Sequence, residues 1–352
     1  MLDNAFLIRY HKPRKHTWGA LKHITGDIYS MRLYKKAAAC LLTAAMAISM
    51  LTACGGGGNG GNGGGNTPSP LPNNPDQIVL PDIDEGGGEG SETKPTKTPI
   101  FDVNNSKLAQ FNKKYAGVTE FYVEMQEVDY GEDGSAARSI NGRAARKGEN
   151  CYVSMTMSGK NQKQQSVEIL MLKNKSTWDQ YLLLRSSKVA VKAGSVKEVH
   201  TSLGSLIAST QPTQMWSTKV KVGPTEYYAE VYNMYPAYEY TTCFTEDGKP
   251  VYQFVRDLRE KQLNSATLYK TIQVGSGTSK GLCALPTGTK TYSFDNEHGT
   301  LSDAKGNVFT LQPQKNGKGE LTGFKVFDNS NKDVTDDFKW VNDFFKMMMS
   351  EE

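Results

Sequence analysis

Apolar and polar residues alternate along most of the chain beyond residue 118, which is the pattern of half-buried β-strands. In residues 119–130 (TEFYVEMQEVDY), Phe121, Val123 and Met125 share one face. Residues 150–159 repeat the pattern, and further strands are expected over 166–174, 177–191, 214–223, 225–234, 237–258 and 265–275. Turn sequences between strands include GEDG at 131–134, NG at 141–142 and DGK at 247–249. The pattern predicts a mainly β fold with a meandering antiparallel sheet.

Two segments within this region have the spacing of helices instead. Asn104 to Tyr115 predict a short capped helix with Leu108 and Phe111 on one side. Residues 194–209 also carry apolar side chains at helical intervals. The sheet is therefore expected to carry one or two helices.

The last sixty residues, 293–352, have a pattern of their own. Short strands are expected around 307–313 and 321–328. An amphipathic helix capped near Thr335 is expected to end the chain, with one apolar stripe made by Phe338, Val341, Phe345 and Met348.

The N-terminal region has a continuous apolar run rather than an alternating one. Arg32, Lys35 and Lys36 precede fourteen mostly apolar residues, Ala37 to Met50, which is the length of an export signal and short for a membrane span. Residues 31–53 are therefore predicted to be a signal peptide. We expect residues 1–30 to be a mis-annotated extension in front of Met31, with a long positively charged region as the alternative.

The signal ends in Leu51-Thr52-Ala53-Cys54, which resembles the lipobox of bacterial lipoproteins. The resemblance implies that Cys54 receives a diacylglycerol thioether and becomes the mature N-terminus. Two or more acyl chains, such as palmitate, hold a protein stably on a membrane. The expected location is the extracytoplasmic side of a bacterial cell membrane, inner or outer. The alternative is a short buried helix with an incidental cysteine.

A tether is predicted over residues 54–101, because glycine, proline, asparagine and acids dominate there. Its expected mean reach is about 35–40 Å. One apolar island, Gln77 to Leu80, interrupts it.

Charge and cysteine content exclude several classes of function. Residues 1–53 hold eight of the 41 basic residues and two of the 37 acidic ones, so the rest of the chain has a net charge near −2. It therefore lacks the excess of basic residues that nucleic-acid binding requires. Three cysteines remain after the leader (Cys151, Cys243 and Cys283), as one disulfide plus a free thiol or as three buried thiols. The two histidines beyond residue 54, His200 and His298, are far apart, so we expect no metal and no cofactor.

Short motifs resemble the lipoprotein-carrier (LolA-like) superfamily. They are Tyr227 to Tyr232, Phe244 to Lys249 with Val251, and Leu282 to Gly288. The resemblance implies that residues 102–292 form a curved antiparallel sheet or half-barrel with a helical lid over an apolar cavity, without catalysis. The tail 293–352 departs from the pattern.

Methionines are frequent at strand positions expected to point inward. They are the candidates for lining a ligand cavity: Met125, Met155, Met157, Met171, Met215 and Met234. Methionine adapts to varied apolar partners, but it also fills gaps in ordinary cores, and that interpretation stays open.

Residues Gly277 to Gly281 (GTSKG) match the G-x-S-x-G nucleophile motif around Ser279. That motif needs a helix directly after it, and Pro286 opposes one. A serine hydrolase is thus a weak third hypothesis.

The leading hypothesis is a non-catalytic surface lipoprotein that binds an apolar or lipid-like ligand. Its rival is an interaction lipoprotein with a solid core that contacts the cell wall or a partner protein. The oligomeric state is open.

Overall fold

The computed structural model describes residues 70–71, 77–81, 96–131, 133–159, 164–199, 203, 212, 214–235 and 238–349, without the side chains of Met234, Tyr235, Met348 and Met349. The expected extension, signal peptide and lipidated Cys54 lie outside these residues. So do most residues of the expected 194–209 helix after Val199. No helix in the described ranges is long and apolar enough to cross a membrane.

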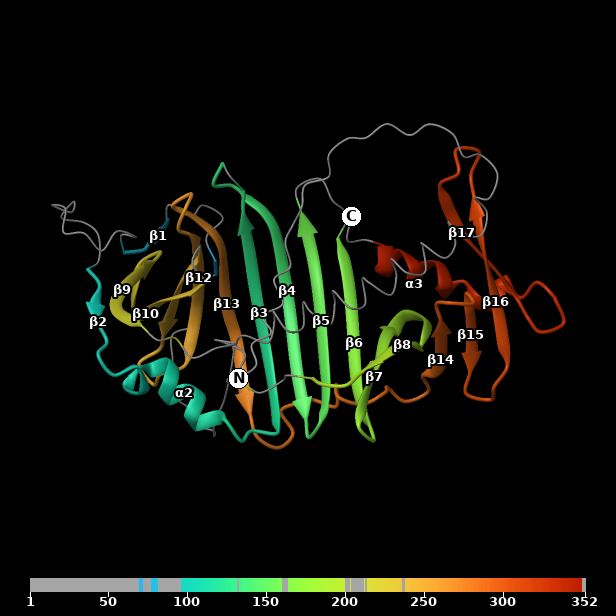
Figure 1. Ribbon diagram of the computed structural model, residues 1–352, viewed down its shortest axis with the longest axis horizontal. Coiled ribbons are helices and arrows are strands. Elements are labelled where there is room, and N and C mark those ends of the chain that lie inside the picture. The colour runs from blue at the N-terminus through green and yellow to red at the C-terminus, as the bar shows by residue number, and fades with distance from the viewer. Residues whose placement is uncertain are drawn as a thin grey trace, which may run out of the picture.

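Seventeen strands of the described chain pair into one large, curved, open sheet (Figure 1). Its order is β9, β10, β11, β12, β13, β3, β4, β5, β6, β7, β8, β14, β15, β16 and β17, with β1 and β2 on the outer edge of β9. All pairs are antiparallel except β8 with β14. The bounds are β1 Ile78–Val79, β2 Thr98–Pro99, β3 Glu120–Tyr130, β4 Ala136–Lys147, β5 Asn150–Gly159, β6 Gln165–Asn174, β7 Thr177–Leu184, β8 Val189–Val196, β9 Met215–Val222, β10 Thr225–Tyr235, β11 Tyr238–Phe244, β12 Pro250–Asp257, β13 Gln262–Val274, β14 Lys290–Asp295, β15 Thr300–Asp303, β16 Val308–Lys315 and β17 Leu321–Phe327.

In the described part of the chain, two α-helices pack on this sheet. They are α2 (Lys107–Tyr115) and α3 (Trp340–Met349), and short 3-10 turns occur at η2 (Val103–Asn105), η3 (Arg185–Ser187) and η4 (Thr335–Phe338). In Figure 1, α2 crosses the lower end of the strands at one side of the molecule, and α3 lies beside β17 at the other. The expected mainly β class and curved antiparallel sheet are confirmed, although the sheet is larger than a half-barrel with a helical lid implies.

Three local expectations are wrong. The NG at 141–142 is not a turn but lies inside β4, where Gly142 pairs with Met125 on one side and Met155 on the other. The strand expected over 177–191 is broken at η3, where Lys188 has a left-handed backbone. The helix expected from residue 194 does not begin there, because 194–196 complete β8 and pair with β7.

Each half of the sheet has its own core. Around α2, the buried side chains include Leu108, Phe111, Phe121, Val123, Met125, Met215, Tyr232 and Phe244; we call the sheet face that carries them the α2 face. Around α3, side chains of β4 to β8 pack against β14 to β17, with Phe344 and Phe345 fully or almost fully buried. Residues 293–349 of the tail therefore extend the same sheet and cover its second half.

The described parts of the expected tether are docked rather than free. Ile78 and Val79 pair with β9, and Thr98 and Pro99 pair with it further along. Leu71 and Ile78 are buried in a third core on the face opposite α2. Apolar burial of this kind offsets the entropy of ordering, and the island at 77–80 supplies it.

Candidate functional site

The predicted methionines divide between the two cores and line no shared space in the described residues. Met125 and Met215 are buried in the α2 core. Met155 and Met171 are buried in the α3 core, and Met157 packs partly buried against it. Met234 lies in β10, but its side chain is outside the described part. Their proposed contact with a ligand is untested.

The three cysteines of the folded part are buried and form no disulfide among the described residues. Burial raises the pKa of the Cys283 thiol to about 12, and it raises that of Cys243 further. Both thiols therefore stay protonated at neutral pH and are poor nucleophiles.

Ser279 lies in a turn without a following helix. Its hydroxyl donates to the Glu120 carboxylate at 2.6 Å, and that carboxylate also accepts the Gly277 amide at 3.0 Å. His298 instead pairs with Asp295, at 2.7 Å, in the turn between β14 and β15. Among the described residues Ser279 thus has a carboxylate partner that fixes the turn, and no histidine bonded to it.

The position of α2 is set by two sequence features. Ser106 caps the helix by accepting the Ala109 amide at 3.0 Å. Glu230 of β10 accepts the Lys107 and Leu108 amides at 2.6 and 2.9 Å, and the Tyr228 hydroxyl at 3.0 Å. This carboxylate is completely buried at the positive end of the helix. Burial raises its pKa, and the amide donors oppose that shift.

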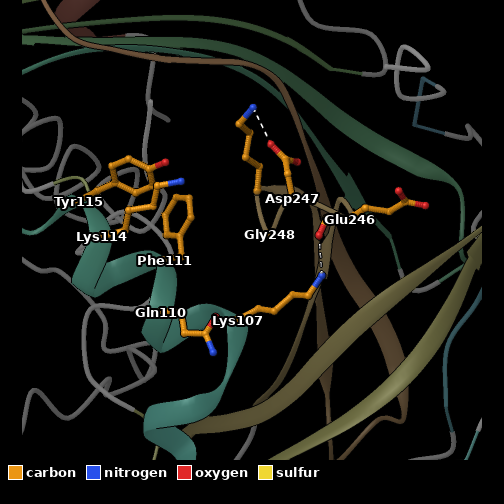
Figure 2. Close-up of a pocket in the computed structure, with 9 residues that line it drawn as sticks. Lys107, Gln110, Phe111, Lys114, Tyr115, Glu246, Asp247 and Gly248 are labelled. Atoms are coloured by element: carbon orange, nitrogen blue, oxygen red, sulfur yellow. Dashed lines mark hydrogen bonds and ion pairs between the residues drawn. The ribbon is translucent and has the colours of Figure 1, made fainter. Parts of the chain in front are cut away.

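A groove of about 270 Å³ lies between α2 and the β11–β12 turn (Figure 2). We call it the α2 groove; its lining residues are Lys107, Gln110, Phe111, Lys114, Tyr115, Glu246, Asp247, Gly248 and Lys249. The rings of Phe111 and Tyr115 meet edge to face at 5.1 Å and form its apolar wall. Helix periodicity places residues 107, 110, 111, 114 and 115 together on this side.

The turn opposite α2 requires its glycine. Gly248 has a left-handed backbone (φ 81°), and its amide donates to the Thr245 carbonyl at 3.0 Å. The Thr245 hydroxyl accepts the Lys249 amide at 2.9 Å. This D-G-K turn therefore holds Asp247 and Lys249 facing the helix.

Positive charge predominates inside the α2 groove. Lys249 and Asp247 pair at 2.8 Å, and the Lys249 ammonium and Thr245 hydroxyl hold the pKa of Asp247 below its usual value. Lys107 extends to the Thr245 carbonyl at 3.1 Å, and Lys114 lies over the Tyr115 ring at 5.1 Å. Figure 2 shows the Glu246 carboxylate directed away from α2. Lys107 and Lys114 thus bring positive charge to the groove from α2, and Lys114 does so directly over the aromatic wall.

The sequence motifs located part of this groove without identifying it. The DGK turn and Glu230 both belong to the stretches that carry the carrier resemblance. Lys107 and Lys114 were not singled out, although they lie four residues before and three residues after Phe111, a spacing that places both cations beside the apolar stripe of the helix.

Comparison with known proteins assigns no family to this chain, because no family model and no curated protein matches it. Structurally similar chains include an uncharacterised conserved protein from Thermus thermophilus, with 9% identity, TM-score 0.31, and 53% of this chain and 96% of that one covered. A DUF1329 family protein from Desulfovibrio piger shares 9% identity, TM-score 0.25, with 50% and 94% covered.

A third similar structure is a putative exported protein with a YmcC-like fold from Bacteroides fragilis, with 6% identity, TM-score 0.17, and 43% and 94% covered. The identities and TM-scores of these three structures are too low to support an argument about function. The proposed function is therefore argued from the geometry of the α2 groove.

Proposed function

We propose that the mature chain is a lipid-anchored, extracytoplasmic bacterial lipoprotein that binds an amphiphilic, lipid-like ligand with an anionic head group, without catalysis. The observation that carries the proposal is the α2 groove, where the Lys114 ammonium lies over the Tyr115 ring of the Phe111–Tyr115 wall and the Lys107 ammonium reaches the Thr245 carbonyl on the opposite side. The Leu51–Cys54 lipobox supplies the anchor.

The chemistry of the groove favours an anionic amphiphile over a neutral one. A carboxylate or phosphate head would gain charge-assisted hydrogen bonds from Lys107 and Lys114. The first part of its chain would lie against the two rings. A volume of about 270 Å³ takes a head group and a short piece of chain, with the remainder of the chain left at the surface.

A second candidate is the interaction lipoprotein with a solid core. The packing of Met125, Met155 and Met171 among protein side chains favours it, because these residues fill two cores instead of facing one space. Under this function the α2 groove would hold a partner's acidic side chain.

The anchor is tested by the mass of the chain extracted from membranes. The proposal expects a mature chain that begins at a diacylated Cys54, and a Cys54→Ser chain that is recovered from the soluble fraction. A mature protein retaining residues 1–30, or a Cys54→Ser chain still held by membranes, would overturn the anchor.

The ligand class is tested by fluorescence titration with a dansyl-labelled undecanoic acid. Lys114 lines the groove, whereas its neighbour Lys113 does not, and both are exposed residues of α2. Lys114→Glu should weaken binding at least tenfold, and Lys113→Glu, with the same change of charge, should leave it within twofold. Equal effects of the two variants would reduce the interaction to bulk charge and contradict the site.

The absence of catalysis is tested at Ser279. We expect no labelling of the full chain by a fluorophosphonate probe, since the Ser279 hydroxyl is bonded to a carboxylate and 2% exposed. Labelling that Ser279→Ala abolishes would restore the hydrolase hypothesis.

A further inference from the structure

A second depression, of about 410 Å³, lies at the other end of the same strands. Its lining residues are Asp129, Tyr130, Tyr238, Tyr240, Val255, Asn264 and Ser265; we call it the tyrosine groove. Lys249, directly before β12, lines the α2 groove, and Val255 of β12 lines the tyrosine groove six residues further along. At about 3.3 Å per residue, the two grooves are roughly 20 Å apart.

The strand register shows how the tyrosine groove is built. Tyr240, Val255, Ser265 and Asp129 stand directly opposite one another across β11, β12, β13 and β3. Directly opposed residues point to the same face of a sheet, and Tyr240 also opposes Tyr232 of the α2 core. The row is therefore on the α2 face, beyond the end of the apolar core.

A β-bulge adds one more polar side chain to this row. The register between β12 and β13 shifts between Val255 and Arg256, which pair with Ser265 and Leu263, so that Asn264 is the extra residue. Bulges turn a side chain away from the regular alternation, and they are frequent beside binding sites. Asn264 accordingly contributes to the lining together with its neighbour Ser265.

The aromatic part of the groove is rigid. The Tyr240 ring stacks on Tyr232 with centroids 5.7 Å apart and planes 7° from parallel. Tyr232 is itself held, because its hydroxyl contacts the Thr242 hydroxyl at 3.3 Å and accepts from the Gln253 amide at 3.2 Å. A ring fixed in this way loses little freedom when a ligand stacks on it.

The polar part is an acceptor set without a cation in the lining. Asp129 is held by Arg138 at 2.6 Å from the neighbouring strand. Glu127, two residues away on the same face, takes up a proton more readily than an ordinary glutamate, because burial and the charge of Asp129 raise its pKa to about 7. A carboxylate, an amide and a hydroxyl can each bond a ligand hydroxyl, whereas an anionic ligand would meet Asp129, and Arg138, the cation bonded to Asp129, is not among the lining residues.

We propose that the tyrosine groove binds a neutral oligosaccharide. The apolar C–H face of a pyranose ring would lie on a tyrosine ring, and its hydroxyls would bond Asp129, Asn264 and Ser265. Six of the seven lining residues carry polar side-chain atoms, which disfavours an acyl chain, and the volume is within the range of small-ligand sites. This binding goes beyond the proposed function and is independent of the α2 groove.

The test is saturation-transfer NMR on the full chain in a detergent without a sugar head group. The probes are the tetrasaccharides chitotetraose, cellotetraose and maltotetraose. At least one should bind, and Tyr240→Ala should weaken that binding at least tenfold while Tyr240→Phe keeps it within threefold. Asn264→Ala, in a half-buried bulge position, should also weaken it severalfold.

Matched variants separate this site from the α2 groove. Lys114→Glu should leave saccharide binding unchanged, and Tyr240→Ala should leave dansyl-undecanoic acid binding unchanged. Circular dichroism shows whether each variant is folded. If Tyr240→Ala does not fold, the loss of saccharide binding in Asn264→Ala tests the site in its place. The proposal is overturned if none of the three tetrasaccharides binds at 10 mM, or if binding survives both Tyr240→Ala and Asn264→Ala.

Discussion

A carboxylate that is buried away from water needs hydrogen-bond donors. Glu230 has three, the two amides in the first turn of α2 and the Tyr228 hydroxyl. Glu230→Ala would leave the Lys107 and Leu108 amides without their acceptor at a buried helix end. We expect it to lower the free energy of unfolding by about 2–4 kcal/mol, measured by urea denaturation. The control is Glu226→Ala, whose carboxylate makes only an exposed pair with Lys219 and should cost less than about 0.5 kcal/mol. Equal costs would contradict the docking role of Glu230.

Glu127 gives stability a distinct pH dependence. Its folded-state pKa of about 7 exceeds the ordinary 4.5, so the folded chain keeps a proton that the unfolded chain has lost between these values. The free energy of unfolding should therefore fall as pH rises from about 4.5 to 7, with a contribution of about 3 kcal/mol from this group. Glu127→Gln should remove that part of the slope in denaturation series at pH 5, 6, 7 and 8. An unchanged slope would mean that the Glu127 carboxyl is solvated in the folded state.

Single residues explain where the sequence-based predictions hold. Met125, Met155 and Met171 were expected to point inward and do so, because alternation in a strand fixes the face of every second residue. What they contact could not be deduced, since that depends on which half of the sheet folds over them. Glu230 looks like an ordinary strand carboxylate in the sequence, and only the approach of α2 gives it a function.

At the scale of elements, the last strand shows how the sheet ends without an exposed edge. The outer side of β17 is bonded by side chains: the Asn342 carbonyl accepts the Phe324 amide at 3.0 Å, and the Thr335 hydroxyl accepts the Val326 amide at 2.9 Å. Such coverage prevents pairing with a second chain. The C-terminal helix therefore protects the sheet as well as covering its second core.

Gly323 is the residue that allows this coverage. A Cβ added there would lie 3.0 Å from the Asn342 side-chain oxygen. Gly323→Ala should displace Asn342, lower the free energy of unfolding by about 1–2 kcal/mol, and increase self-association in sedimentation experiments. Gly317→Ala, where nothing lies within 4 Å of the added atom, is the matched control. If both variants behave like the parent chain, Asn342 does not seal the edge.

Element boundaries were predictable wherever periodicity and turn chemistry agreed. Residues 150–159 form β5 over their full length, and the DGK turn joins β11 to β12 as expected. The NG at 141–142 failed because tertiary packing overrides a local turn preference: Gly142 accommodates the Met125 side chain, 3.0 Å from where a Cβ would be. The strands β4, β14 and β15 escaped prediction because their alternation is weak, and β14 also pairs with β8, which is distant in sequence.

At the scale of the whole molecule, the docked N-terminal arm (Leu71 and residues 77–81) would shorten the proposed link to the membrane. Leu71 is already buried, so seventeen residues separate it from Cys54 in place of the 47 expected for the tether. The mean reach falls from about 35–40 Å to roughly 20–25 Å. With Cys54 lipidated, the β9 edge of the sheet would stay nearest the membrane.

A buried ionic cluster fixes this arm. Glu239 pairs with Arg256 and with Lys97 at 2.6 Å, and Arg256 donates to the Pro81 carbonyl at 2.6 Å. Glu239→Ala leaves the Arg256 guanidinium buried without its carboxylate and should cost about 3–5 kcal/mol of unfolding free energy. Hydrogen exchange at Ile78 and Val79 should accelerate in the variant. Unchanged exchange there would show that the arm is held by Leu71 and Ile78 alone.

The most direct measurement of the central claim is photo-crosslinking of the full chain with a fatty acid that carries a diazirine close to its carboxylate. The α2 groove predicts adducts on α2, within residues 107–115, and on the turn at 245–249, and it predicts their loss when unlabelled fatty acid competes. Adducts confined to other parts of the sheet, or adducts that competitor does not reduce, would contradict it.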